Sequence, residues 1–289
     1  MKCIVTGGLG FVGSNLVDTL ISQGHNVVVV DNEATGSLDN LNVRANLYNL
    51  DIRHNLDCFL QEEGKIDVIF HLAALARIQP SFARPFTTID VNCMGTVNVL
   101  ELARKLECKV VYAGSSSFYA DPHKNPYAHS KWIGEEHCRM YSKVYGLSTC
   151  ITRFFNVYGP RHVRNGENAC VLGIFERQKI AGQPLTITGT GEQRRDFTSV
   201  FDICDGLIAA SQKTWEGETF NLGRGSNHSI NEVAQMYKPD KVEYIPARKG
   251  EAWETLADLT TTREMLGWEP KRDLVDYVNK FLESTNGSV

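Results

Sequence analysis

The chain has 289 residues, of which 42 % are hydrophobic, and a formal net charge of -4. This composition supports a folded core of one large or two modest domains and excludes an intrinsically disordered chain. A sequence pI near 6.1 gives no basic surface for nucleic acid, and no apolar run reaches the roughly 20 residues that cross a bilayer.

Apolar segments in the first half of the chain are typical of strands that are buried on both faces of a parallel sheet. They span residues 2–7, 26–32, 67–73, 109–116 and 148–156. Segments with leucine, valine and alanine at helical spacing lie between them, at 13–24 and 95–107. This alternation predicts an α/β fold of Rossmann type, a doubly wound parallel sheet that binds its ligand at the strand carboxyl ends.

The pattern changes from about residue 158 onward. Helical segments are predicted at 171–182, 199–212, 230–237, 261–267 and 274–284, and short strands at 185–188 and 219–223. The segments 199–212 and 219–223 can return to the first sheet. We therefore expect a cofactor domain formed by residues 1–157 and 191–222, a smaller α/β substrate domain formed by 158–190 and 223–289, and a cleft between them.

The segment TGGLGFVG directly follows the first predicted strand and opens the first predicted helix. Gly7, Gly10 and Gly13 let the backbone turn tightly and approach a pyrophosphate, which the free N–H groups of the helix N-terminus attract. A glycine motif in this context predicts a dinucleotide site.

Asp31 ends the second predicted strand, 18 residues after Gly13. A carboxylate at this place accepts hydrogen bonds from ribose hydroxyls and repels a 2′-phosphate, so we expect NAD rather than NADP. The alternative is an aspartate that only caps a helix or turn. Asp51 and Ile52, in the segment LDIRH, are weaker candidates for the adenine edge.

The segment GSSSFYADPHKNPYAHSK holds three serines, a tyrosine and a lysine. A helix that begins near Pro126 would place Tyr127 and Lys131 on one face. Tyrosine, with a pKa of about 10, is a poor base at neutral pH, but a nearby ammonium and an oxidised nicotinamide favour the phenolate. Ser115, at the end of a predicted strand, can hydrogen-bond the substrate hydroxyl. The cluster predicts general base catalysis coupled to hydride transfer.

The cysteines and the N-terminus indicate a compartment. The eight cysteines show no CxxC pair and no zinc spacing, so we expect reduced, mostly buried thiols and no metal site. The segment MKCIVTGG has too few residues before its glycines for the apolar part of a signal peptide. We therefore expect a cytoplasmic protein.

Together these motifs resemble the extended short-chain dehydrogenase/reductase family, in its branch that acts on nucleotide-sugars. The resemblance covers the whole chain, because the landmarks TGGLGFVG, VVVVDN, FHLAA, YAGSSSFY, YAHSK, RFFNVYGPR, RRDFTSVFD, FNLGRG and LGWEPK occur in the family's order. The likeness is greatest to UDP-sugar 4-epimerases, which interconvert UDP-glucose and UDP-galactose with a bound NAD. It implies an isomerase that forms a transient 4-keto sugar.

The resemblance also implies a role for individual positions. Tyr127 would be the base, Lys131 its partner and Ser115 the second catalytic hydroxyl. The positions implied for NAD are Gly7, Gly10, Phe11, Val12, Gly13, Asp31, Asn32, Asp51, Ile52, Ala73, Ala74, Asn92, Tyr127 and Lys131. Those implied for the sugar nucleotide are Ser115, Ser116, Asn156, Arg195, Arg248 and Thr255. Two arginines suit a diphosphate, because the planar guanidinium pairs with phosphate oxygens.

Other branches of the family differ after the active hydroxyl. The 4,6-dehydratases carry Asp and Glu there, and UDP-glucuronate decarboxylases usually carry a Glu. This chain has Ser116 and Ser117, which cannot supply a carboxyl acid/base. A UDP-glucuronate 4-epimerase or decarboxylase stays an alternative, because Arg77, Arg161 and Arg164 lie in loops expected near the sugar. The alternative from another class is a non-catalytic NAD-binding sensor or scaffold.

Departures from the family pattern concern the substrate. The interval from Tyr119 to Tyr127 is shorter than is usual in the family, which should open the cleft near the sugar. Thr188 stands where an aromatic often packs on the base. Thr255 matches a gate position at which a small residue admits an N-acetyl group, so we expect N-acetylhexosamines to be accepted.

The family usually dimerises through two helices of the cofactor domain, which here correspond to residues 87–106 and 126–145. The apolar face would come from Val97, Leu100, Met140, Tyr141 and Val144. We therefore expect a homodimer, although burial inside the monomer would give the same sequence pattern.

Overall fold

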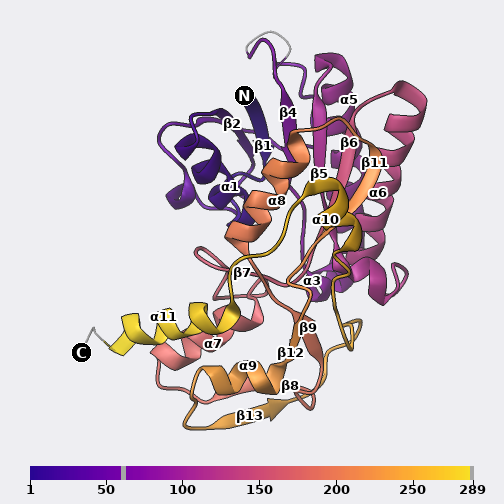
Figure 1. Cartoon of the computed structure of the whole chain (residues 1–289). Coiled ribbons are helices and arrows are strands. Elements are labelled where there is room, and N and C mark those ends of the chain that lie inside the picture. The colour runs from indigo at the N-terminus through magenta and orange to yellow at the C-terminus, as the bar shows by residue number, and fades with distance from the viewer. Residues whose placement is uncertain (60–62, 287–289) are drawn as a thin grey trace.

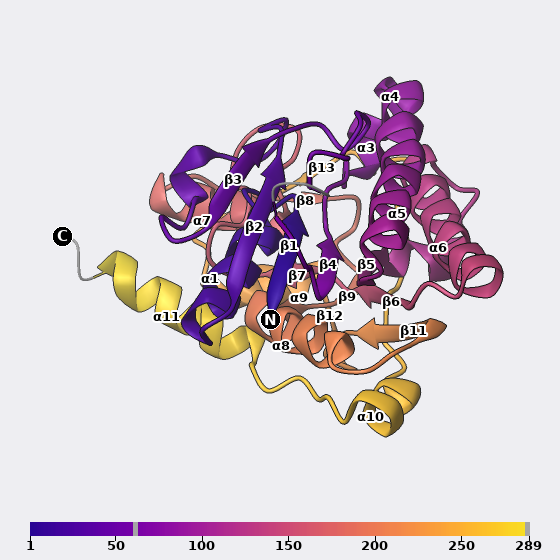
Figure 2. The ribbon, with the colours of Figure 1, turned by 90° about the horizontal axis from the view of Figure 1, so that it is seen from above.

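The computed structural model describes residues 1–59 and 63–286. Within these residues, parallel strands form a seven-stranded sheet in the order β11-β6-β5-β4-β1-β2-β3. The strands are β1 (Lys2–Thr6), β2 (Asn26–Asp31), β3 (Asn46–Asn49), β4 (Val68–His71), β5 (Lys109–Ser115), β6 (Thr149–Phe154) and β11 (Glu216–Leu222). Helices lie on both sides of this sheet (Figures 1 and 2), so the predicted doubly wound Rossmann-type fold is confirmed.

The apolar runs form strands because both faces of the sheet are covered. In β1, Cys3 and Val5 belong to one buried cluster while Ile4 belongs to the other. Val27 and Val29 of β2 alternate with their neighbours in the same way. Successive side chains of a strand point to opposite faces, so a run that is apolar at every position fits only a sheet buried on both sides.

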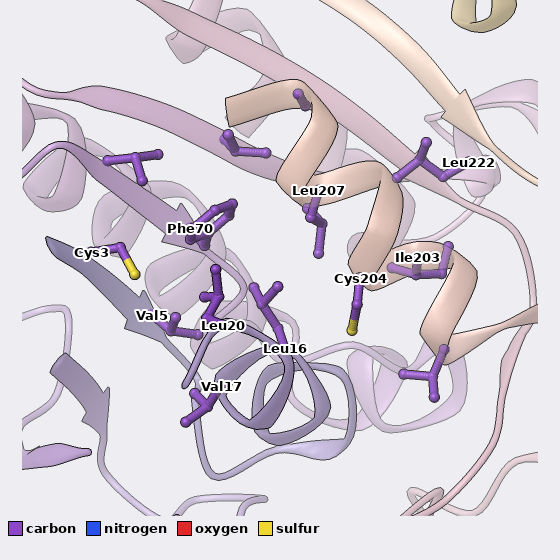
Figure 3. Packing of buried hydrophobic residues seen from close by; sticks show 14 of the residues in the cluster. Cys3, Val5, Leu16, Val17, Leu20, Phe70, Ile203, Cys204, Leu207 and Leu222 are labelled. Atoms are coloured by element: carbon purple, nitrogen blue, oxygen red, sulfur yellow. The ribbon is translucent and has the colours of Figure 1, made fainter. Parts of the chain in front are cut away.

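Two pairs of helices cover the two faces. Helices α1 (Phe11–Ser22) and α8 (Val200–Ser211) pack on one face through the first cluster, in which Leu16 and Leu207 are fully buried (Figure 3). Helices α5 (Gly95–Leu106) and α6 (Pro126–Tyr145) cover the other face through the second cluster. The short helices α3 (Ile78–Ala83) and α4 (Pro85–Ile89) and the π-helical turn η2 (Asp90–Met94) precede α5.

A smaller unit lies beyond the carboxyl ends of the strands, in the lower part of Figure 1. Its core is a third buried cluster that includes Phe175 and Tyr237. Its elements are β7 (Val157–Tyr158), α7 (Val171–Ile180), β8 (Leu185–Thr188), β9 (Arg194–Asp196), β10 (Thr198–Ser199), β12 (Asn227–Ser229), α9 (Ile230–Met236), β13 (Val242–Ile245) and α11 (Leu274–Asn286). Their strands pair as β10 with β7, β12 with β9, and β13 with β8.

One segment of the C-terminal third returns to the large sheet. Ala257, Leu259 and Trp268 are buried in the first cluster, and α10 (Thr260–Leu266) contacts β11 and α8. The predicted boundary at residue 223 does not include this return, because a short amphipathic helix does not indicate which surface its apolar face covers. The domain boundaries stay a prediction.

Remaining short elements are the 3-10 turns η1 (Leu38–Asn40) and η3 (Ser116–Ala120). Across the part of the chain that the structure describes, every helix is too short or too polar to cross a membrane.

Helix α6 approaches β5 closely because it has a glycine at the contact. A Cβ added at Gly134 would lie 2.1 Å from the Tyr112 hydroxyl oxygen and 2.6 Å from its ring carbon Cζ. The Tyr112 hydroxyl donates to the backbone oxygen of Lys131 at 3.3 Å. Tyr112 is fully buried, so its ring has no free space to give way.

Gly134→Ala is therefore expected to destabilise the protein by about 1–3 kcal/mol, because overpacking a dense core costs this much. The usual gain from replacing glycine inside a helix, about 1 kcal/mol, should not offset an overlap of this size. Urea unfolding measures the difference. Lys143→Ala, at an exposed position of the same helix, should change stability by less than about 0.5 kcal/mol; equal stability of the two variants would contradict the tight contact.

Candidate active site

The site lies in a cleft between the carboxyl edge of the sheet and the smaller unit. Its volume is about 610 Å³, and residues of both units line it. The sheet order reverses at β1, which pairs with β2 on one side and with β4 on the other. Ligands of doubly wound sheets bind at such a switch point, just beyond the strand carboxyl ends.

The glycine turn lies at this point. Gly7 has a φ of +71°, a left-handed conformation that favours glycine. A Cβ at Gly13 would lie 2.1 Å from the backbone oxygen of Gly7, so no larger residue fits. Gly10 caps α1 without a side-chain hydrogen bond, which leaves the first N–H groups of the helix available to an anion. Phe11 and Val12 also line the cleft.

Asp31 ends β2 with its carboxylate held in place. One oxygen accepts from the Leu9 N–H at 3.0 Å and the other from the Glu33 N–H at 2.8 Å. Each oxygen can accept a further hydrogen bond, and Asp31 lines the cleft. The glycine turn and this carboxylate together fit an adenosine ribose and pyrophosphate.

A second acidic residue, Asp51, also lines the cleft. Asn32 donates to Asp51 at 2.9 Å, and Arg53 forms an ion pair with Asp51 at 2.7 Å. The Arg53 guanidinium holds the pKa of Asp51 at about 2. Asn32, Asp51 and Ile52, which we expect to bind the cofactor, line the cleft, and so does Arg53, which was not predicted. Ala73 and Ala74, after β4, complete this wall.

Ser115, Tyr127 and Lys131 come together in the cleft. The Tyr127 hydroxyl donates to Ser115 Oγ at 3.2 Å, and Ser117 Oγ donates to the same oxygen at 2.9 Å. Pro126 is at the first turn of α6, and the Asn125 side chain caps the helix by accepting from Ala128 N–H at 2.8 Å. This cap fixes where the helix begins, and so where Tyr127 lies.

Burial opposes charge on both titratable groups of this cluster. It raises the pKa of Tyr127, although the hydrogen bond to Ser115 and the charge of Arg77 act in the opposite direction. It also lowers the pKa of Lys131 from 10.5 to about 8. The lysine ammonium lies over the Tyr112 ring, 4.2 Å from its centroid. In the free protein the pKa of Tyr127 therefore lies above its usual value. The lowered pKa that we expect from the sequence requires the positive charges of both Lys131 and an oxidised nicotinamide.

The residues expected to bind the sugar nucleotide also line the cleft. They are Ser116, Asn156, Arg195, Arg248 and Thr255. Thr255 is buried and donates to the Asn156 side-chain oxygen at 3.4 Å. Arg195 donates to the backbone oxygens of Arg194 at 2.9 Å and Ala252 at 2.7 Å.

Asn92 does not line the cleft. It is buried, accepts from the Leu75 N–H at 2.8 Å and donates to Ser130 Oγ at 2.9 Å. Leu75 does line the cleft. Asn92 thus braces the loop after β4 from behind, a role that sequence spacing does not distinguish from direct contact.

Only one of the three arginines considered for a uronate reaches the cleft. Arg77 lines it, whereas Arg161 pairs with Asp18 at 2.7 Å and Arg164 with Glu176 at 2.7 Å. These partners cannot be recognised from the sequence, because the acidic residues lie on α1 and α7 rather than in the same loops.

A doubly wound sheet with a glycine turn at its switch point and a serine–tyrosine–lysine cluster beside it is typical of a dinucleotide-dependent enzyme. The family model "NAD dependent epimerase/dehydratase family" matches residues 3–223. The chain therefore belongs to the NAD dependent epimerase/dehydratase family.

Known members of the family are similar to this chain over nearly its whole length. A UDP-glucose 4-epimerase of Mycolicibacterium smegmatis is 34% identical over 312 residues, which cover 98% of each chain. UDP-glucuronic acid decarboxylase 1 of Arabidopsis thaliana is 33% identical, over 99% of this chain and 72% of its own. The structure of a UDP-glucose 4-epimerase of Thermotoga maritima with UDP-glucose superposes with a TM-score of 0.92 and 32% identity, covering 100% of this chain and 99% of the other.

The buried lysine predicts a dependence of stability on pH. Between the native pKa of about 8 and the ordinary value of 10.5, the unfolded chain binds a proton that the native protein has released. Stability should therefore rise with pH through this window. Compared with Lys131→Met, the wild type should gain up to about 3 kcal/mol between pH 7 and pH 10.5. Urea unfolding at about pH 7 and about pH 9.5 measures most of this change; a stability difference that does not vary with pH would contradict it.

Proposed function

We propose that the protein is an NAD-dependent 4-epimerase of a UDP-sugar and interconverts UDP-glucose and UDP-galactose. The observation that carries the proposal is the Tyr127 hydroxyl, 3.2 Å from Ser115 Oγ, in a cleft that extends from the glycine turn to Arg195. Two of the relatives reported above bear the name UDP-glucose 4-epimerase, one of them with UDP-glucose bound.

NAD would be held by the glycine turn, by Asp31 and by the segment after β4. The fit rests on the positions at which a Cβ would collide with backbone and on a carboxylate that repels a 2′-phosphate. When bound there, NAD would supply a reversible hydride acceptor for C4 of the sugar.

The side chains of the cluster move the proton. Tyr127 accepts the proton of the sugar 4-hydroxyl, and Ser115 hydrogen-bonds the same oxygen. Burial raises the pKa of Tyr127 in the free protein, so the positive charge of the oxidised nicotinamide is needed to favour the phenolate. Lys131 adds charge when protonated. After the 4-keto sugar turns over in the cleft, Tyr127 returns the proton.

The cleft also bears on the range of substrates. Thr255 is small and contacts Asn156, so we propose that a 2-N-acetyl group is accepted as well. Arg195 and Arg248 would bind the diphosphate in exchange for the backbone oxygens that Arg195 contacts now.

A UDP-glucuronate 4-epimerase or decarboxylase is the second candidate. It is favoured by Arg77 in the cleft and by the likeness to a UDP-glucuronic acid decarboxylase. It is disfavoured because Ser116 and Ser117 offer no carboxyl group beside Ser115. A protein that binds NAD without catalysis is the third candidate.

Purified protein is expected to interconvert UDP-glucose and UDP-galactose, and the N-acetylated pair, without added reductant and without net NADH. Chromatographic separation of the products measures this. Carbon dioxide from UDP-glucuronate would support decarboxylation instead, and bound NAD without any turnover would support a sensor.

Tyr127→Phe should lower the epimerase rate by about 10²- to 10⁴-fold, the range that general base catalysis contributes. NAD should remain bound, which absorbance after denaturation measures. Tyr119→Phe is the matched control, because this exposed tyrosine is outside the cleft lining. Full activity of Tyr127→Phe would refute its role as the base.

We further propose that the chain forms a homodimer through α4, η2 and α6. Phe86, Met94 and Val144 are exposed to 81%, 53% and 62%, and together they offer large apolar side chains to an interface. Leu100 and Tyr141, which were expected in the interface, are buried in the monomer. The eight free thiols support a reducing compartment such as the cytoplasm.

Sedimentation is expected to give twice the monomer mass of 32.3 kDa, and Val144→Asp should shift the protein toward the monomer. Burying an unpaired carboxylate in an apolar interface costs several kcal/mol. Val43→Asp is the matched control, because Val43 is 95% exposed and lies outside these helices. A monomeric wild type would contradict the proposal.

A further inference from the structure

Cys170 is an unusual cysteine, because it lines the cleft. Six of the eight cysteines are buried, and only Cys58 and Cys170 are partly exposed. Cys170 is the N-cap of α7, and its sulfur accepts a hydrogen bond from the Gly173 N–H at 3.4 Å. The N-terminus of a ten-residue helix therefore faces this sulfur and favours negative charge on it.

A buried histidine lies beside this sulfur. His162 is 5% exposed, and its Nε2 lies 2.8 Å from a carboxylate oxygen of Glu176. The other ring nitrogen, Nδ1, is buried without a regular hydrogen bond to any described residue. The Cys170 N–H donates to the backbone oxygen of Val163, the residue after His162, at 3.1 Å, and the thiol and the imidazole each shift the pKa of the other. A carboxylate, an imidazole and a thiol thus stand in sequence, as in an activated nucleophile.

The carboxylate of this series is held firmly. Tyr277 of α11 donates to Glu176 Oε1 at 2.9 Å, and Arg164 pairs with Oε2 at 2.7 Å. Glu176 has no exposed side-chain surface. The hydrogen bond to this carboxylate places a proton on Nε2 and leaves Nδ1 as the ring nitrogen available to the thiol.

The charges around the pair favour its ionised form. Burial alone would lower the pKa of His162 and raise that of Cys170. Cys170 and Glu176 outweigh burial at the histidine and raise its pKa to about 9. His162, the Gly173 N–H and Arg77 outweigh it at the cysteine, whose pKa is lowered. Both shifts favour the thiolate and imidazolium form of the pair over the neutral form.

We propose that Cys170 is a nucleophilic thiolate in the wall of the cleft and a site of covalent modification by small neutral electrophiles, of which hydrogen peroxide is the biological example. The sulfur attacks one peroxide oxygen, and the S–O bond forms as the O–O bond breaks. The sulfur loses two electrons, and the departing hydroxide takes a proton from His162 and leaves as water. The product is a sulfenic acid, which a thiol can reduce again.

The first test is the rate at which iodoacetamide alkylates each cysteine of the purified protein at pH 6, followed by peptide mapping. An ordinary thiol is only about 0.3% ionised at this pH. A fully ionised Cys170 would have a thiolate fraction more than about 100-fold higher than an ordinary thiol. Its less basic sulfur is also a weaker nucleophile, which reduces this gain in rate by about tenfold. Cys170 should therefore react at least about tenfold faster than Cys58. Equal rates would overturn the proposal.

Variants separate activation from exposure. His162→Asn should lower the ratio of the Cys170 rate to the Cys58 rate to about one, whereas His54→Asn, a change at an exposed histidine, should leave it unchanged. Labelling of the buried Cys138 would reveal a variant that has unfolded, and the ratio in the wild type then decides. A ratio that His162→Asn does not change, in a folded variant, would overturn the role of the histidine.

Peroxide tests the chemistry directly. Brief treatment should block later alkylation of Cys170 but not of Cys58, and dithiothreitol should restore it. Persistent labelling of Cys170 after peroxide would refute the oxidation step.

A last test, protection of Cys170 by substrate, rests on the proposed function. Saturating UDP-glucose should slow the alkylation of Cys170, since both occupy the cleft. Fast alkylation of Cys170 that UDP-glucose does not slow would count against the proposed substrate but would support the nucleophilic thiolate. Slow alkylation that UDP-glucose slows further would support the substrate and count against the thiolate.

Discussion

The close contact between α6 and β5 determines the geometry of the site. Gly134 leaves room for the Tyr112 ring, and the Tyr112 hydroxyl binds the backbone of Lys131 one turn earlier. The same strand ends in Ser115, so strand and helix are fixed to each other at a buried point near the reacting groups. The 3.2 Å between the Tyr127 and Ser115 hydroxyls follows from this contact. Loops cannot hold two side chains with this accuracy, because few buried contacts restrain them.

The same burial that fixes the cluster also sets its resting charge. Lys131 is buried and Tyr127 is half-buried, and burial shifts each toward its neutral form. The nearby Arg153 and Glu135 are buried too, but they neutralise each other through hydrogen bonds of 3.0 and 2.6 Å. The cluster therefore holds a neutral phenol rather than a preformed phenolate. A cationic ligand in the cleft changes this balance more than a change in pH near neutrality would.

Much of the fold was predictable from the sequence because two-sided burial leaves a strong signal. The valine run of β2 and the alternation of strands with helices needed no partner to be recognised. By contrast, β3 has the sequence NLYN and lacks such a run. The glycine turn and the pair formed by Tyr127 and Lys131 were likewise predictable, because they depend on local spacing. Asn92, Arg161 and Arg164 depend on distant partners, and spacing cannot reveal those. The pKa of Tyr127 depends on burial, which the sequence does not measure.

Arg77 joins the two sides of the cleft. It follows β4, and its Nε donates to the backbone oxygen of Asn168, two residues before Cys170, at 2.8 Å. Its charge lowers the pKa of Tyr127 and that of Cys170 against the effect of burial. One guanidinium therefore favours the anionic form of a phenol on one wall and of a thiol on the other. A bound diphosphate would compete for this charge, so occupancy of the cleft should weaken the support that both groups receive from it. At Tyr127 the charge of an oxidised nicotinamide can replace that of Arg77. Cys170 retains the charge of His162. The phenol and the thiol thus depend on different cations once the cleft is filled.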